Sequence, residues 1–208
     1  MPFPTLIQVA ESMRSPKLLG LVLSGGKGRR MGRDKGSIIY HGKSQRSYCY
    51  DLLARHCESV YVSCRKEQAR LLRRSQNRIE DQKFFQELGG PGVGLLSAHE
   101  FSPSSAWLVL ACDMPFVDDS VIERLLEGRN PSRCATAFLG PEDRRPEPLL
   151  AIWEPRGLEL FQEGASRGRT SLREALESLD CEFLEPPSRK SLININTRED
   201  LKQAAGYL

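Results

Sequence analysis

The sequence is poor in the features that build metal clusters, disulfide frameworks and membrane segments. Its six cysteines form no Cys-x-x-Cys pair and its three histidines are scattered, which argues against a zinc site and predicts reduced thiols. No apolar run approaches the length of a membrane span, and Arg14 and Lys17 follow the short N-terminal apolar patch, whereas in a signal peptide the charges precede it. These absences predict a cytoplasmic protein without a membrane partner.

A strong excess of charge is also missing. The 30 Lys and Arg residues and 27 Asp and Glu residues leave a formal charge of +3, which does not favour nucleic acid as a partner. The chain has 208 residues and 39% hydrophobic residues, enough for one domain with a substantial core. Residues 1–16 contain three prolines and little periodicity, so we expect an N-terminal extension followed by one domain over residues 17–208.

Apolar runs of strand length alternate with helical patterns along most of the chain, which is typical of an α/β fold with a mostly parallel sheet. Pro141 to Pro148 is predicted to form a polar connection between the strands expected at residues 134–139 and 149–153. The predicted strands cover residues 18–23, 60–63, 78–81, 107–112, 134–139, 149–153 and 192–196, with an extended piece at 181–184. The predicted helices cover residues 44–58, 66–74, 95–101, 118–127, 155–164 and 171–179, and Thr197 can cap one more.

The first apolar run breaks into a loop rich in glycine and positive charge. Glycines at 25, 26, 28 and 32 allow backbone N–H groups to approach an anion closely. The alternative is a basic turn without a ligand. The segment from Gly26 to Met31 lacks the third glycine of the dinucleotide fingerprint, and it contains no P-loop pattern. The loop therefore predicts a site for a nucleoside triphosphate, with cations from Lys27, Arg29, Arg30, Arg33 and Lys35.

Asp113 directly follows the apolar run 107–112, at the carboxyl end of a strand, where ligands of open α/β sheets collect. A carboxylate in that place is a candidate metal ligand. The alternative is a helix N-cap, for which Asp118 and Asp119 are better placed. A second glycine-rich loop, residues 88–94, indicates another place where backbone approaches a neighbouring group closely.

The segment from Leu23 to Lys35 resembles the signature of the nucleotidyltransferases that build activated sugars and cofactors. Within that superfamily it is most similar to the molybdenum cofactor guanylyltransferases. Three further motifs stand in the order of that family, at Gly90 to Gly94, Cys112 to Pro115 and Asn194 to Thr197. The resemblance covers nearly all of residues 17–206. It implies a three-layer, Rossmann-like nucleotide-diphospho-sugar transferase fold with a mostly parallel central sheet.

The resemblance also implies roles for individual residues. Arg30, Lys35 and Asp113 would be catalytic, and Asp113 would hold Mg²⁺ between the triphosphate oxygens. The implied nucleotide-binding residues are Leu23, Ser24, Gly25, Gly26, Lys35, Asp81 and Asp113.

The base is expected to be guanine. By the same resemblance Asp81 would accept the two adjacent N–H groups of the guanine edge, although it is equally placed to be a surface acid beside Glu80. In the related molybdopterin cytidylyltransferases the first loop resembles Leu-Ala-Ala-Gly, with an alanine at the position where this chain has Gly25. The second loop likewise resembles that of the guanine group, so GTP is favoured over CTP.

The acceptor side has a weaker signature. Asn194 and Asn196 would alternate with Ile195 along a strand and point to one face, where the resemblance places them in the active site. Turn chemistry before Thr197 is the alternative. Arg169 begins a segment that resembles one near the acceptor in the family.

The chain departs from the family pattern at four places. Ser24 replaces the usual alanine, Val93 a leucine and Arg198 a common proline, and these changes are small in physical terms. Residues 44–46, Ser-Gln-Arg, replace the usual start of the next helix, which puts in doubt how closely this region packs or recognises substrate as the family does.

The implied reaction transfers GMP from GTP to molybdopterin, forms the guanine dinucleotide cofactor and releases pyrophosphate. Other cofactor-biosynthesis proteins or molybdoenzymes would receive the product. Two alternatives stay open from the sequence: another nucleotidyltransferase, for molybdopterin and CTP or for a sugar or polyol phosphate, and a non-catalytic nucleotide-binding protein.

Overall fold

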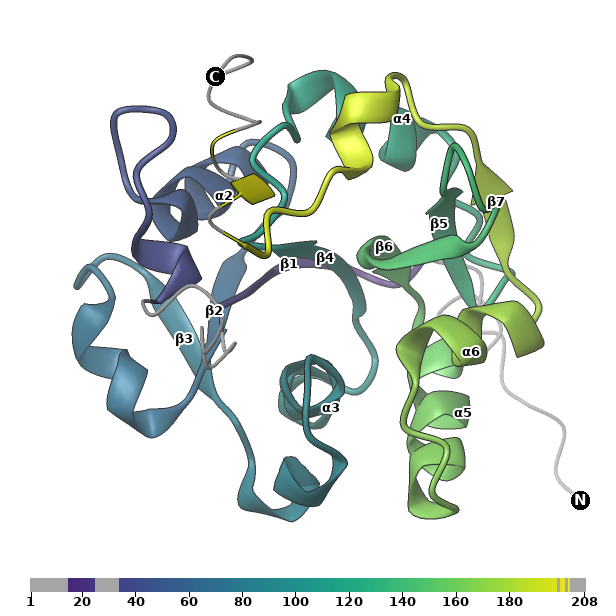
Figure 1. The fold of residues 1–208 in the computed structure, drawn as a ribbon. Coiled ribbons are helices and arrows are strands. Elements are labelled where there is room, and N and C mark those ends of the chain that lie inside the picture. The colour runs from purple at the N-terminus through teal and green to yellow at the C-terminus, as the bar shows by residue number, and fades with distance from the viewer. Residues whose placement is uncertain (1–14, 25–33, 198, 201, 203–208) are drawn as a thin grey trace, which may run out of the picture.

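One mixed sheet runs through the molecule, in the order β3-β2-β1-β4-β6-β5-β7 (Figure 1). The computed structural model describes residues 15–24, 34–197, 199–200 and 202, so most of the predicted N-terminal extension and of the first glycine-rich loop lies outside the described residues. The strands are β1 Leu18–Leu23, β2 Val60–Cys64, β3 Asn77–Glu80, β4 Ala106–Ala111, β5 Ala135–Leu139, β6 Pro146–Trp153 and β7 Glu182–Leu184.

Strand direction decides which residues meet at the edge that carries the site. β1 is parallel to β2 and β4, β2 is parallel to β3, and β5 is parallel to β7, whereas β6 is antiparallel to both β4 and β5. The carboxyl ends of β3, β2, β1, β4 and β5 therefore share one edge with the amino end of β6. The predicted mostly parallel sheet is confirmed.

Helices cover both faces of the sheet, which confirms the predicted three-layer α/β fold (Figure 1). α2 Gln45–Leu53 and α4 Asp119–Glu127 pack on one face, and α3 Gly92–Phe101, α5 Pro155–Ser166 and α6 Leu172–Ser178 pack on the other. Short 3₁₀ helices are η1 Lys35–Ser37, η2 Lys66–Leu71, η3 Lys83–Leu88 and η4 Arg189–Leu192. Within the described residues, no helix combines the length and apolarity needed to cross a bilayer.

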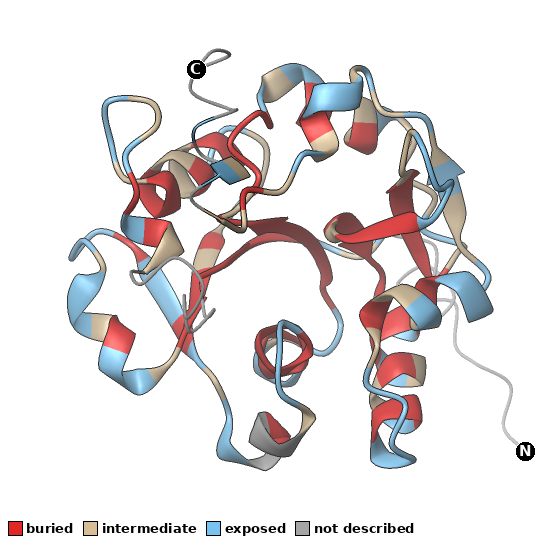
Figure 2. Ribbon diagram, in the orientation of Figure 1, coloured by how far each residue is buried: buried red, intermediate tan, exposed pale blue. Residues whose placement is uncertain are grey.

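Alternate side chains of the central strands enter two separate cores, and the strands are buried almost throughout (Figure 2). In β1, Leu19, Leu21 and Leu23 join the core beneath α3, α5 and α6, while Val22 joins the core beneath α2 and α4. Trp107 and Leu108 of β4 divide in the same way. Because both faces are covered, the strands read as continuous apolar runs without polar alternation.

β6 begins three residues earlier than predicted, so the connection before it is shorter than Pro141 to Pro148. Pro146 already pairs with Leu139 of β5, while pairing with β4 ends at Leu150. The first part of β6 thus has a ladder on one side only. Prolines lack an N–H group, and they are tolerated in a strand where one side carries no ladder.

The strand predicted over residues 192–196 is wrong. η4 ends at Leu192, and Ile195 N donates instead to the carbonyl of Asp113 at 2.7 Å, outside any strand ladder. The nearest strand, β4, is already flanked by β1 and β6, so it has no free edge for another strand. Predicted helix limits shift as well: α2 ends at Leu53 and α3 already begins at Gly92.

Candidate active site

A lysine, an aspartate and an asparagine from three separate segments meet at the site edge. Lys35 Nζ lies 3.1 Å from Asp113 Oδ2 and 2.5 Å from Asn196 Oδ1. Lys35 opens η1 beyond β1, Asp113 follows β4, and Asn196 lies beyond η4. The side chains of Lys35 and Asp113 are 22% and 18% exposed, so the ion pair is only partly screened by solvent.

Asp113 is free for a ligand on its other oxygen. Asp118, and not Asp113, caps α4, because its Oδ1 accepts the Val121 N–H at 3.2 Å. Asp113 Oδ1 is buried and finds no hydrogen-bond partner among the described residues, and the same holds for Asn194 Oδ1. Buried oxygens without partners are costly, and hard oxygen ligands are those that Mg²⁺ prefers.

The residues present fit a substrate-assisted magnesium site. Nowhere in the described chain do three or more His, Cys, Asp or Glu side chains gather in a way that could hold a metal. Mg²⁺ commonly takes one or two carboxylates and completes its shell with water and substrate phosphates. Asp113 matches that pattern as the carboxylate ligand.

A cavity of about 670 Å³ opens in front of Asp113. Its walls come from the second glycine-rich loop, the start of β6, the segment at the start of α6, and Asn194 with Asn196. Ile195 between the two asparagines is 1% exposed, so both amides face the cavity although the segment is not a strand. A neighbouring cavity of about 580 Å³ shares four of these lining residues, Arg145, Glu147, Arg173 and Asn194.

Glu147 is a site residue that the sequence did not indicate. It is 6% exposed and lines both cavities, and its Oε1 accepts the Leu149 N–H at 2.9 Å. The pKa of Glu147 is raised above its ordinary value, mainly by burial. Hydrogen bonds from Leu149 and Asn194 and the charge of Arg173 oppose that rise. A glutamate between two prolines at the head of an apolar run was the available signal.

Asp81 lies at the far end of the same sheet edge, after β3. Ser63 Oγ donates to Asp81 Oδ1 at 2.9 Å. Burial raises the pKa of Asp81, and the Ser63 hydrogen bond and the charge of Arg65 oppose that rise. β3 and β4 are separated by β2 and β1, which puts Asp81 roughly 14 Å from the Asp113 strand at ~4.8 Å per strand. The two carboxylates therefore bracket an edge long enough for a nucleotide.

A model of the MobA-like NTP transferase domain matches residues 20–182. The chain belongs to this family. The matched range begins within β1, includes Asp81, Asp113 and Glu147, and ends before Asn194.

Individual relatives agree with the family. The chain is 34% identical over 189 residues to the molybdenum cofactor biosynthesis bifunctional protein of Synechocystis, covering 89% of this chain and 53% of that protein. It is 30% identical over 183 residues to a molybdenum cofactor guanylyltransferase of Pseudomonas aeruginosa, covering 86% and 90%. It thus spans about half of the bifunctional relative and most of the guanylyltransferase.

Among solved structures, molybdopterin-guanine dinucleotide biosynthesis protein A of Archaeoglobus fulgidus superposes with a TM-score of 0.74. That protein is 28% identical, and the match covers 91% of this chain and 97% of the other. A 4-diphosphocytidyl-2C-methyl-D-erythritol synthase of Anaerococcus prevotii, 11% identical with a TM-score of 0.68, shares the fold. The MobA-like chain therefore has the nucleotidyltransferase architecture.

The first nucleotide motif of this MobA-like chain is only partly described. Gly25, Gly26 and Arg30 lie outside the described residues. Leu23 ends β1, and Ser24 is 4% exposed with its N–H donating to Ser63 O at 3.3 Å.

Arg169 does not line either cavity. It packs beside Gly164 of α5, whereas Thr170, Ser171 and Arg173 line the larger cavity. Thr197 has the predicted capping contact, since its Oγ1 accepts the Asp200 N–H at 3.1 Å. The capping contact at Thr197 therefore occurs together with the position of Asn194 and Asn196 in the cavity wall, and it does not replace that position.

Proposed function

We propose that the protein transfers GMP from GTP to molybdopterin and releases pyrophosphate. The observation that carries the proposal is the meeting of Lys35, Asp113 and Asn196 at the edge of a MobA-like fold, in front of a cavity. Relatives named molybdenum cofactor guanylyltransferase, which match over most of their length, support the same reaction.

The reaction is a direct displacement at phosphorus. An oxygen of the molybdopterin phosphate forms a bond to the α-phosphorus of GTP, and the bond from that phosphorus to the bridging oxygen breaks. The bonding electrons leave with pyrophosphate. The attacking phosphate is already anionic, so the protein does not need to remove a proton, and positioning with charge neutralisation supplies the catalysis.

Lys35 is proposed to neutralise charge that develops on the transferred phosphoryl group and on pyrophosphate. Arg30 with the backbone of Gly25 and Gly26 is proposed to hold the triphosphate. Asp113 is proposed to hold Mg²⁺, which when bound supplies positive charge to the phosphate oxygens. Preorganised cations of this kind contribute several kcal/mol to transition-state stabilisation.

Guanine is proposed to bind at Asp81. An ionised carboxylate accepts both donors of the guanine edge, N1–H and the 2-amino group, and the partial burial of Asp81 reduces competition from water. Leu23 and Ser24, at the end of β1 between Asp81 and Asp113, are proposed to pass beneath the nucleotide.

Molybdopterin is proposed to enter the cavity in front of Asp113. Asn194 and Asn196 offer amide donors and acceptors there, and Arg145 and Arg173 offer cations for an anionic acceptor. The product would pass to a molybdoenzyme or to another cofactor-biosynthesis protein in the cytoplasm, and neither nucleic acid nor a membrane has a role.

Product analysis tests the proposal. Purified protein with Mg²⁺, molybdopterin and an equimolar mixture of GTP, CTP, ATP and UTP should form the guanine dinucleotide and pyrophosphate in equal amounts. Omitting molybdopterin, or replacing it by sugar or polyol phosphates, should abolish pyrophosphate release. Preference for CTP would overturn the guanine assignment, turnover with a sugar phosphate would overturn the acceptor, and nucleotide binding without any turnover would indicate a binding protein.

A further inference from the structure

Two places where the sequence departs from the family pattern touch each other in the fold. Arg46, in the second position of α2, donates from Nε to Ser24 Oγ at 2.7 Å and pairs through Nη2 with Asp34 Oδ2. Ser24 and Asp34 flank residues 25–33, and Asp34 directly precedes Lys35. Arg46 thus joins the end of β1 to the start of η1.

The surroundings of Arg46 provide both the acceptors and the space that its buried guanidinium group needs. Arg46 is 3% exposed, and a cation in the first turn of a helix faces an unfavourable macrodipole, so its burial depends on these acceptors. A Cβ atom added at Gly36 would lie 2.7 Å from both Arg46 Nη2 and Ser24 Oγ. Glycine at position 36 therefore leaves the room that the guanidinium fills.

The residue before Arg46 reaches the other half of the catalytic pair. Gln45 is fully buried, and its Nε2 lies 3.4 Å from the carbonyl of Met114, which directly follows Asp113. His41, just ahead of α2, contacts the Pro115 carbonyl at 2.9 Å through Nε2. The approach to α2 and its first turn therefore contact the neighbours of both Lys35 and Asp113.

We infer that Arg46 is a positioning residue that holds Lys35 against Asp113 and Asn196. Arg46 fixes Asp34, so the direction in which Lys35 leaves the backbone is set before any substrate arrives. The catalytic consequence rests on the proposed guanylyl transfer, whereas the effect on Lys35 itself does not.

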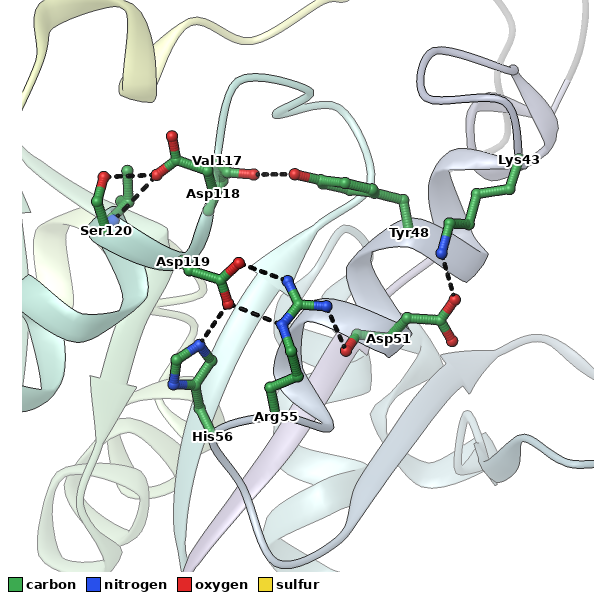
Figure 3. A network of polar contacts seen from close by, with 10 residues as sticks. Lys43, Tyr48, Asp51, Arg55, His56, Val117, Asp118, Asp119 and Ser120 are labelled. Atoms are coloured by element: carbon green, nitrogen blue, oxygen red, sulfur yellow. Dashed lines mark hydrogen bonds and ion pairs between the residues drawn. The ribbon is translucent and has the colours of Figure 1, made fainter.

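The first test reads Lys35 directly. Arg46→Met should speed acylation of Lys35 by an amine-reactive ester, followed by mass spectrometry, about fivefold or more, because local opening frees the amine. The exposed Lys66 serves as the internal reference. The matched control is Arg55→Met, just past α2, whose guanidinium pairs with Asp119 on the surface (Figure 3).

A second variant keeps this test decisive if Arg46→Met does not fold. Ser24→Ala removes one acceptor and introduces the residue usual in the family, so it should raise Lys35 acylation by a smaller factor than Arg46→Met. If acylation of Lys35 stays within about twofold of wild type in every folded variant, the segment that carries Lys35 does not open more often when Arg46 or its acceptor is removed. Arg46 then does not position Lys35.

The kinetic test is a double-mutant cycle with Lys35→Ala. Arg46→Met should lower kcat for pyrophosphate release about 10- to 100-fold in the wild-type background, as expected for a misplaced catalytic group. In the Lys35→Ala background the same change should cost less than about threefold, because interacting residues are not additive. Arg46→Lys should restore part of kcat, and equal losses in both backgrounds would overturn the inference.

The two tests fail separately. If the wild-type protein does not turn over GTP with molybdopterin, the proposed function falls, and the acylation result still decides whether Arg46 holds Lys35. If turnover is as proposed but Lys35 acylation and the cycle do not respond, only the role of Arg46 falls.

Discussion

The two halves of the candidate site are built on strands that run in opposite directions. In the half proposed to bind the nucleotide, Ser24 and Asp81 each follow the carboxyl end of a parallel strand. In the half proposed to bind the acceptor, Glu147 stands at the amino end of the antiparallel β6, and Asn194 and Asn196 lie on a segment without regular structure. A search for polar residues after buried strands therefore finds the first half and misses Glu147.

The halves also share a feature. Each contains a carboxylate whose pKa is raised, mainly by burial: Asp81 after β3 and Glu147 in β6. Guanine and the pterin of molybdopterin both present an N–H group beside an amino group, so under the proposed function each carboxylate would accept from the same kind of hydrogen-bonding edge. Asp113 stands between the halves and belongs to both.

Asp113→Ala should have the largest effect, because it removes the residue on which both halves depend. We expect kcat for pyrophosphate release to fall about 10³-fold or more, since preorganised charge at the phosphates is lost. The measurement is steady-state pyrophosphate release, with circular dichroism to monitor folding. Asp118→Ala is the control: it removes the α4 cap and should cost about 1 kcal/mol of stability without changing kcat. Unchanged turnover in Asp113→Ala would contradict the site.

Asp81→Asn should change the nucleotide half alone. An asparagine accepts one guanine N–H but opposes the other, so kcat/KM for GTP should fall about 10- to 100-fold. Xanthine carries a carbonyl where guanine has its amino group, so kcat/KM for XTP should rise in the same variant. The KM for molybdopterin should not change. Equal losses for GTP and XTP would show that Asp81 does not contact the base.

The same variant gives a pH-dependent stability readout. The folded state favours protonated Asp81, so the contribution of this residue to stability is greatest below the ordinary pKa near 3.8 and is lost as the pH rises through the raised folded value. Asp81→Asn lacks this loss. Its melting temperature at pH 7 should equal or exceed that of wild type, which separates weak GTP binding from unfolding.

Glu147→Gln should change the acceptor half alone, by a smaller factor. The amide oxygen of glutamine still accepts the Leu149 N–H, so the fold is retained. The variant loses one acceptor for the pterin edge, and Arg173 loses the negative charge with which it pairs. We expect KM for molybdopterin to rise about tenfold, the cost of one charge-assisted hydrogen bond, with KM for GTP unchanged. Arg156→Gln, at an α5 position outside both cavities, should change neither constant.

Asp119→Asn should have the smallest effect, because it lies in neither half. Its hydrogen bonds with Arg55, and secondarily with His56, lower the pKa of Asp119 to about 2 (Figure 3). This pair stabilises the fold above the ordinary pKa near 3.8, and the contribution is lost as the pH falls toward 2. Asp119 is 48% exposed, so denaturant unfolding at pH 7 should change by less than about 1 kcal/mol, with kcat unaltered.

Much of the fold was predictable because buried strands carry a strong signal. β1 and β4 are apolar without interruption, and the sheet and its three layers follow from such runs. A local signal also sufficed for the Asp118 cap of α4. The start of β6 was missed because prolines there oppose a strand, and only its place beside β5 makes them acceptable.

The site was less predictable where it depends on contacts between distant segments. The sequence singled out Lys35, Asp113 and Asn196 separately, but their contact is a property of the fold. The family pattern marked Ser24 as a nucleotide-binding position with an unusual residue, and it marked residues 44–46 only as a departure. Their contact through Arg46 required α2 to return to the end of β1, which no local spacing specifies.

The reversed direction of β6 has a consequence for how substrate choice can diverge. β5 and β6 form a hairpin whose turn, residues 140–145, lines the smaller cavity. Gly140, Asp143 and Arg145 of this turn form part of the cavity wall. Hairpin tips accept insertions and deletions with little penalty to the rest of a domain. If molybdopterin binds as proposed, beside the wall that the two cavities share through Arg145, changes in this turn can alter acceptor preference without altering the nucleotide half of the sheet edge.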